Sequence, residues 1–252
     1  MKKKKQALDD KNYISGIYNY CDRWCEKCAY TANCLLFTNE SKIITHEILN
    51  NGDLTGLKDV LYDDFTDDEG EDYSDDFLPD DEEIFGGENK WDIDKEEEEK
   101  PPHMLEILSD EFFEKGHSFL NSINEKYNLF PPQKEKLLDP RFKRIHDGFE
   151  VISWYHTFIG AKVRRALMGK EDLFEEEDEE MRGFTHEDIN GSAKVAAIGI
   201  TRSIVSLNQL YSELTEHHTE ISELLVIAGK MLNEVELEFP GYKEFKRPGF
   251  DE

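Results

Sequence analysis

The sequence predicts a mainly α-helical protein in three parts: a small N-terminal metal unit ligated by cysteines, a disordered acidic linker, and a C-terminal antiparallel four-helix bundle. Three observations predict this fold class. All four cysteines fall within 14 residues near the N-terminus, a dense acidic run occupies residues 62–100, and four stretches with helical apolar spacing follow that run. The sequence contains no run of alternating β-branched residues long enough for a sheet, and no internal repeat.

Length and charge limit the classes of function. The chain has 252 residues, with 57 acidic and 30 basic side chains and a formal net charge of −27. This length allows one domain plus a small one, which excludes a large multidomain enzyme. So acidic a surface repels phosphate groups, and we therefore expect no sequence-independent binding to nucleic acid and no binding to an anionic membrane. The lysines at positions 2–5 are not followed by an apolar signal core, so we expect a cytoplasmic protein.

The N-terminal unit is predicted over residues 11–55, and its chemistry lies in four cysteines. Cys21, Cys25, Cys28 and Cys34 are separated by three, two and five residues, and the rest of the chain contains no cysteine. In a reducing compartment, clustered thiols with paired spacing are more often metal ligands than disulfides. We predict that the four bind one metal centre together. The alternatives are a buried helical face that uses cysteine as a small apolar residue, and a redox-active dithiol.

The identity of the metal depends on the local conformation. Residues 12–29 have apolar residues at helical spacing, so we expect a helix that carries the first three cysteines on one face. Positions seven apart on a helix are about 10 Å apart along its axis, whereas four thiolates around one zinc ion lie within about 4 Å of one another. A wider iron–sulfur cluster is therefore favoured over zinc. A zinc site would require the helix to end near Trp24.

Part of the cysteine pattern is similar to a known family. Cys21-x3-Cys25-x2-Cys28 resembles the cluster motif of radical S-adenosylmethionine enzymes, and the sequence Gly-Gly-Glu at 86–88 resembles their methionine-binding motif. Such a resemblance implies a barrel of alternating strands and helices with the cysteine loop after a first strand. The segments around the cysteines and beyond residue 103 have helical spacing instead, so we carry no site residue over from this family.

The linker is predicted over residues 62–103. Between residues 62 and 100 there are 20 acidic residues and 3 lysines, a net charge of −17. Like charges at this density cannot be gathered in a core, and the few apolar residues keep no helical or strand period. We therefore expect a disordered spacer. The aromatic residues within the acid leave a second interpretation open, a short segment that folds onto a basic partner.

The first two bundle helices are predicted from apolar residues at steps of three and four. The first spans 104–127 and the second runs from Asp139, a plausible N-cap, to Gly169. His156 is the one polar residue on the apolar seam of the second helix. We expect it to be buried and hydrogen-bonded to a neighbouring helix.

The last two helices complete the predicted bundle. The third carries its apolar stripe from 193 to 214, and the sequence Asn-Gly-Ser at 190–192 is expected to open it. The fourth has Thr219 as its expected cap and stops at Phe239, which precedes a proline. Four such stripes can close around one core, so we predict an antiparallel bundle over 104–252 with the aromatic C-terminal tail packed on it.

The bundle sequence contains no convincing catalytic constellation. Glu114-x2-His117 has the spacing found in carboxylate-bridged di-iron sites, which also require further inward carboxylates. Glu114 faces away from the apolar stripe of its helix, and no glutamate lies where it could join His156 as a ligand. We therefore expect no catalytic site.

Taken together, the sequence predicts a metal-binding accessory protein that acts by protein interaction, with a protein partner and either an iron–sulfur cluster or zinc at its cysteines. The alternative is an iron–sulfur protein for redox chemistry or electron transfer. A di-iron oxidoreductase built in the helical bundle is a third hypothesis.

Overall fold

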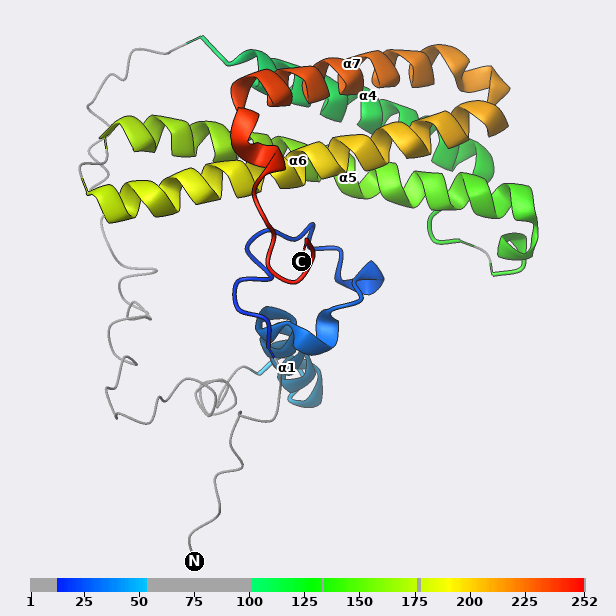
Figure 1. The fold of residues 1–252 in the computed structure, drawn as a ribbon. Coiled ribbons are helices and arrows are strands. Elements are labelled where there is room, and N and C mark those ends of the chain that lie inside the picture. The colour runs from blue at the N-terminus through cyan, green and yellow to red at the C-terminus, as the bar shows by residue number, and fades with distance from the viewer. Residues whose placement is uncertain (1–12, 54–100, 133, 176–177, 252) are drawn as a thin grey trace, which may run out of the picture. The chain divides into compact units, whose positions relative to one another are not determined.

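The structure is a computed structural model that describes residues 13–53, 101–132, 134–175 and 178–251. The described chain is mainly helical and contains no strand, as the sequence predicts (Figure 1). The acidic run at 62–100, and with it the predicted disordered spacer, lies outside the described residues. The α-helices of the described part are α1 (Leu35–Leu49), α4 (Met104–Tyr127), α5 (Pro140–Glu175), α6 (Glu179–Glu213) and α7 (His218–Glu238).

The chain divides into two compact units. One, which we call the N-terminal unit, contains residues 1–14 and 28–101; the other, the helical unit, contains residues 15–27 and 102–252. Helix α1 belongs to the N-terminal unit, and α4 to α7 belong to the helical unit. Residues 15–27 therefore pack with the four long helices, although the sequence places them in the cysteine unit.

The four helices of the helical unit surround one apolar core. Helix α4 packs against α5 and α7, and α6 packs against the same two helices (Figure 1). None of the described helices is both long and apolar enough to cross a lipid bilayer. The largest side chains fully buried in this unit include Leu105, Phe112, Ile123, Ile145, Ile152, Tyr155, Ile159, Ile200, Leu207 and Leu210.

Capping interactions explain where the first two of these helices begin. At the start of α4, the backbone N–H of Leu105 donates to His103 Nδ1 at 3.1 Å, and the backbone N–H of His103 donates to Glu106 at 2.9 Å. This reciprocal pair satisfies two backbone donors that a helix start leaves free. The predicted cap of α5 is confirmed, because Asp139 accepts from the backbone N–H of Phe142 at 2.8 Å.

Helix α6 begins at Glu179, about three turns earlier than the position that we inferred from Asn190. Its cap is Asp178, which accepts from the backbone N–H of Glu180 at 2.8 Å. The acidic residues of its first turn also suit the partial positive charge of a helix start. The expectation that residues 190–192 open this helix is therefore wrong. Asn190 lies in the helix interior and donates back to the carbonyl of His186 at 3.0 Å.

Helix α7 and the tail follow the predicted pattern closely. The helix begins at His218, so Thr219 lies inside it and is not its cap. It ends at Glu238, immediately before the predicted stop. In the tail, Phe239 and Tyr242 are buried and belong to the core of the helical unit.

The continuous helix expected over residues 12–29 is absent from its described part. Residues 15–20 form turns, and a 3-10 helix covers only Cys25–Lys27. Gly16 and Arg23 have φ values of 72° and 57°, which a right-handed helix does not accommodate. The inference that the cysteines spread along one helix, which favoured a cluster over zinc, therefore loses its basis.

Candidate functional site

None of the four predicted ligands forms a disulfide in the described structure, and each is half-buried. The boundary between the two units separates them into pairs. Cys21 and Cys25 belong to the helical unit, whereas Cys28 and Cys34 belong to the N-terminal unit. We describe each pair within its own unit.

The sulfur atoms of the N-terminal pair accept backbone hydrogen bonds. The N–H of Tyr30 points to Cys28 Sγ at 3.4 Å, and the N–H of Phe37 points to Cys34 Sγ at 3.5 Å. Cys34 is the N-cap of α1, where the helix start carries partial positive charge. Donors of this kind favour a thiolate and tune the sulfur ligands of metal centres. A thiol that merely caps a helix would accept the second bond as well.

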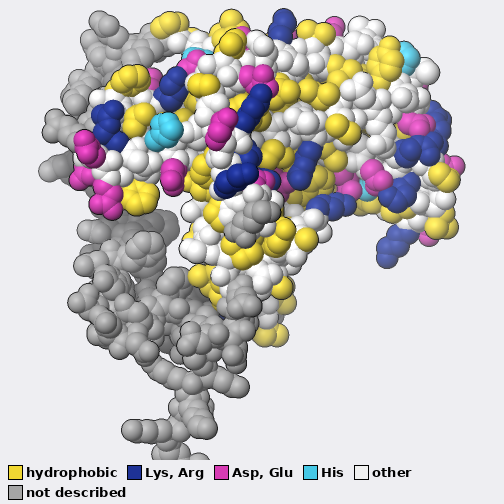
Figure 2. Space-filling view, in the orientation of Figure 1, with side chains coloured by type: hydrophobic (Ala, Val, Ile, Leu, Met, Phe, Trp, Pro, Cys, Tyr) yellow, Lys and Arg dark blue, Asp and Glu magenta, His cyan; other side chains and the backbone are white. Residues whose placement is uncertain are grey.

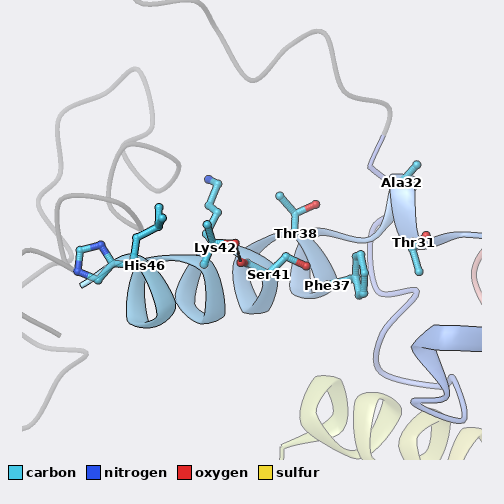
Figure 3. A pocket seen from close by; sticks show the side chains of 9 residues that line it. Thr31, Ala32, Phe37, Thr38, Ser41, Lys42 and His46 are labelled. Atoms are coloured by element: carbon cyan, nitrogen blue, oxygen red, sulfur yellow. Dashed lines mark hydrogen bonds between the residues drawn. The ribbon is translucent and has the colours of Figure 1, made fainter. Parts of the chain in front are cut away.

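Few interactions stabilise the described part of the N-terminal unit. None of its described residues is buried, and α1 exposes Ile44, Ile48 and Leu49. The described contacts include a backbone hydrogen bond from Ile14 to Asn33 at 3.0 Å. An open hollow of about 750 Å³ runs along α1, and Figure 3 shows the side chains that line it, among them Phe37. Apolar burial therefore contributes little to this unit.

Cys21 lies in an electropositive part of the helical unit. Lys162 of α5 is half-buried, and burial lowers its pKa; the neighbouring charge of Arg165 acts in the same direction. The charge of Cys21 raises the pKa of Lys162, so the sulfur and the ammonium group interact electrostatically. The ammonium lies 5.5 Å from the centroid of the Phe158 ring, and Lys162 has no ion pair with any described residue. The carboxylate of Asp188 also acts on Lys162, and a thiolate at Cys21 would be stabilised by the same ammonium group.

Asp22, next to Cys21, anchors this segment on α5 and α6. The buried Tyr155 hydroxyl donates to Asp22 Oδ2 at 2.6 Å, and the Arg202 guanidinium donates to the same oxygen. The indole N–H of Trp154 donates to the backbone carbonyl of Asp22 at 2.9 Å. Burial, followed by the hydrogen bond to Asp22, raises the pKa of Tyr155. Tyr155 therefore remains a neutral donor at physiological pH.

Aromatic packing adds to this anchor. The ring of Trp24 stacks on Trp154 with centroids 5.5 Å apart and planes 13° from parallel. Tyr20 packs edge-on against Phe245 of the tail, with centroids 4.7 Å apart. The segment that carries Cys21 and Cys25 is thus fixed on the helices. The sequence signal for this anchor is an aspartate and a tryptophan, Asp22 and Trp24, between two cysteines.

The histidines considered for a di-iron site form an aromatic stack. His156 lies with its ring centroid 5.5 Å from that of Phe113 and 6.1 Å from that of His117. It is buried, as expected, but its Nδ1 lies 2.9 Å from the carbonyl of Ser153, in its own helix. The expected hydrogen bond to a neighbouring helix is therefore wrong. Burial lowers the pKa of His156, which favours a neutral ring.

Charge on the helical unit is mixed in sign. Figure 2 shows acidic and basic side chains interspersed over the face that it displays. Many of them are paired across helices, such as Lys115 with Glu223 at 2.6 Å. Proteins that bind nucleic acid without sequence preference carry a continuous basic patch instead.

The chain matches no protein-family model, no curated protein and no solved structure. We therefore infer its function from the chemistry of its residues.

Proposed function

We propose that Cys21, Cys25, Cys28 and Cys34 bind one metal centre and that the chain is an accessory protein that docks a protein partner. The observation that carries this proposal is the lack of any buried side chain among the described residues of the N-terminal unit. Isolated helices of the length of α1 are marginal in water. Metal ligation can replace a core, since structural zinc contributes roughly 10–16 kcal/mol to the folding of small units.

Two local features support thiolates at these positions. Backbone N–H groups donate to Cys28 and Cys34, and the ammonium of Lys162 interacts with Cys21. Four thiolates carry a charge of −4, so zinc or a cluster leaves a net negative centre that nearby cations stabilise. Both an iron–sulfur cluster and zinc fit this donor set.

The proposed organisation is a cysteine unit at residues 11–55, an acidic spacer at 62–103 and an antiparallel four-helix bundle at 104–252, in a cytoplasmic protein. The order in which α4 to α7 contact one another supports the bundle. The bundle or the spacer would dock the partner.

Electron transfer is the second candidate, and one observation favours it. Trp24 directly precedes Cys25 and stacks on Trp154, so aromatic rings extend from the cysteine segment onto α5. A cluster beside such a stack could exchange electrons with a partner. Reversible bleaching of the visible spectrum on reduction would select this role over a purely structural one.

Metal analysis of anaerobically purified protein tests the proposal. Iron with sulfide and broad visible absorption identifies a cluster, and one colourless zinc ion identifies a zinc site. We expect each single Cys→Ser change to lower the metal content and to accelerate hydrogen exchange in α1. Thr31→Ala, in the same segment, is the control and should leave both unchanged. Unchanged metal content in all four cysteine variants would refute the proposal.

A further inference from the structure

We propose that His146, Asp147 and Glu150 of α5 form a second metal site, independent of the cysteines, for a divalent transition metal such as Zn²⁺. The Nδ1 atom of His146 lies 3.9 Å from a carboxylate oxygen of Glu150 and 4.0 Å from one of Asp147. One ligand atom from each residue lies within 4.8 Å of the other two. In the described part of the helical unit, this is the group of three potential ligands with such a geometry.

The imidazole of His146 makes no hydrogen bond to another described residue. The residue is 8% exposed, and its polar contacts are the two carboxylates, both too distant for a hydrogen bond. Nδ1 faces the space between two carboxylates, which is where a cation bound by all three would lie. The buried ring of His146 distinguishes this group from a cluster made of exposed carboxylates alone.

The distances require only a small adjustment for a bound ion. Zinc takes histidine nitrogen and carboxylate oxygen at about 2.0–2.2 Å, so the ligand atoms of a tetrahedral site lie about 3.4 Å apart. The two separations from His146 Nδ1, 4.0 Å to Asp147 and 3.9 Å to Glu150, exceed this value by roughly half an ångström. The side chains of Asp147 and Glu150 are 46% and 35% exposed and can rotate inward. A nitrogen with two oxygens suits Zn²⁺ better than Ca²⁺ or Mg²⁺, which take mainly oxygen ligands.

Two lysines neutralise the carboxylates in the metal-free arrangement. Lys27 lies 3.1 Å from Glu150, and Lys143 lies 2.6 Å from Asp147. Both ammonium groups belong to side chains that are more than half exposed. Such surface ion pairs contribute little, so a divalent ion can displace them. The lysines then act as competitors that reduce the affinity for the metal.

The site opens on a hollow in the helical unit. This hollow has a volume of about 450 Å³, and Asp147 and Glu150 line it together with Trp24, Tyr155 and Arg202. Three protein ligands leave a fourth position on zinc for water or a ligand oxygen. That position can face the hollow, where the Arg202 guanidinium favours an anionic oxygen.

A Co²⁺ titration of the full-length protein, purified anaerobically, tests the second site. Cobalt bound by thiolates gives intense sulfur-to-metal charge-transfer absorption, whereas cobalt bound by nitrogen and oxygen gives only weak visible bands. We expect one equivalent of Co²⁺ without charge-transfer absorption, and this equivalent should persist in the Cys→Ser variants. A variant that lacks the cysteine centre can therefore still be tested for the second site. Either proposal can be refuted without refuting the other.

Substitutions assign the ligands. Glu150→Gln and Asp147→Asn change exposed side chains and should each weaken Co²⁺ binding roughly tenfold or more. Lys27→Gln should strengthen binding, because it removes a competing cation from Glu150. His146→Gln should abolish binding, and circular dichroism of the same variant will show whether α5 remains folded.

Another buried histidine supplies the matched control. His217 lies 3.4 Å from Glu220, but both its ring nitrogens are sealed from solvent and it faces this single carboxylate. Glu220→Gln should therefore leave Co²⁺ binding unchanged. Binding that is insensitive to Glu150→Gln and Asp147→Asn, or the absence of any Co²⁺ free of charge-transfer absorption, would overturn the proposal.

Discussion

Gly191 is a position where α6 and the anchored N-terminal segment lie very close together, and replacing it with alanine tests that packing. A Cβ atom at this position would lie 2.3 Å from two ring carbons of Tyr20 and 3.0 Å from the ring of Phe245. Carbon atoms in contact lie about 3.5–4.0 Å apart, so the overlap with Tyr20 exceeds an ångström. The Tyr20 ring has little room to move, because it packs edge-on against Phe245.

The expected loss follows from three contributions. Overpacking of this kind costs about 1–3 kcal/mol, and the disturbed aromatic pair contributes about 0.5–1.5 kcal/mol. Alanine has a higher helix propensity than glycine, which offsets this loss by about 1 kcal/mol. We therefore expect Gly191→Ala to lower the free energy of unfolding by about 2 kcal/mol. Gly183→Ala, in the same helix with no atom within 4 Å of the new Cβ, should raise it by about 0.5–1 kcal/mol.

Urea denaturation followed by circular dichroism measures both variants, and hydrogen exchange of residues 15–27 detects local release of the segment. The decisive variant combines Gly191→Ala with Tyr20→Ala. Without the ring the new methyl group has space, so alanine at 191 should then stabilise the protein. Stabilisation by Gly191→Ala in the wild-type background, with exchange of residues 15–27 unchanged, would refute the inferred close approach.

Three further predictions follow from burial and charge. Burial lowers the pKa of His156 from 6.5, and the neutral form of the ring therefore contributes stability above pH 6.5. This stability is lost as the pH falls through the lowered pKa of the folded state. His156→Leu should make the free energy of unfolding less dependent on pH in denaturation curves and should cost less than about 2 kcal/mol. Asp22→Ala leaves the buried hydroxyl of Tyr155 without its acceptor and should cost about 1–3 kcal/mol in urea denaturation, whereas Asp110→Ala, which removes an exposed ion pair, should cost about 0–1 kcal/mol. Deleting residues 63–99 should leave metal content and partner binding unchanged; binding that disappears on deletion and weakens steeply with salt in the intact protein would instead identify the acidic run as the binding segment.

The four long helices could be predicted because their burial is periodic. The bounds predicted for α4 match those observed, since its apolar stripe starts after a proline pair and ends at Tyr127. The start of α6 was missed for the opposite reason. Its first turns expose Met181 and Phe184 and bury nothing, so they show no apolar period, and the helix there depends on the Asp178 cap.

The cysteine segment shows what periodicity cannot predict. Its apolar residues have helical spacing, but the backbone turns at Arg23, and the contacts that decide its conformation come from residues far away in the sequence. Asp22 is fixed by Tyr155 and Arg202, which lie more than 130 and 175 residues further along the chain. The group at His146, with Glu150 four residues later on one helix face, was visible in the sequence as a spacing. The group lies beside the apolar seam of α5, which passes through Ile145 and Phe149, so no apolar period marks it.

The burial of the cysteines bears on whether they are ligands or packing residues. Free cysteine is among the residue types most often fully buried, because it behaves as a small apolar side chain. None of the four is buried here, although the described helical unit buries many aliphatic residues fully. The packing of their segment on α5 and α6 is carried by Asp22 and Trp24, which lie between Cys21 and Cys25. Packing therefore does not explain why sulfur occupies these four positions, whereas ligation to a metal requires sulfur ligands that their neighbours hold in place.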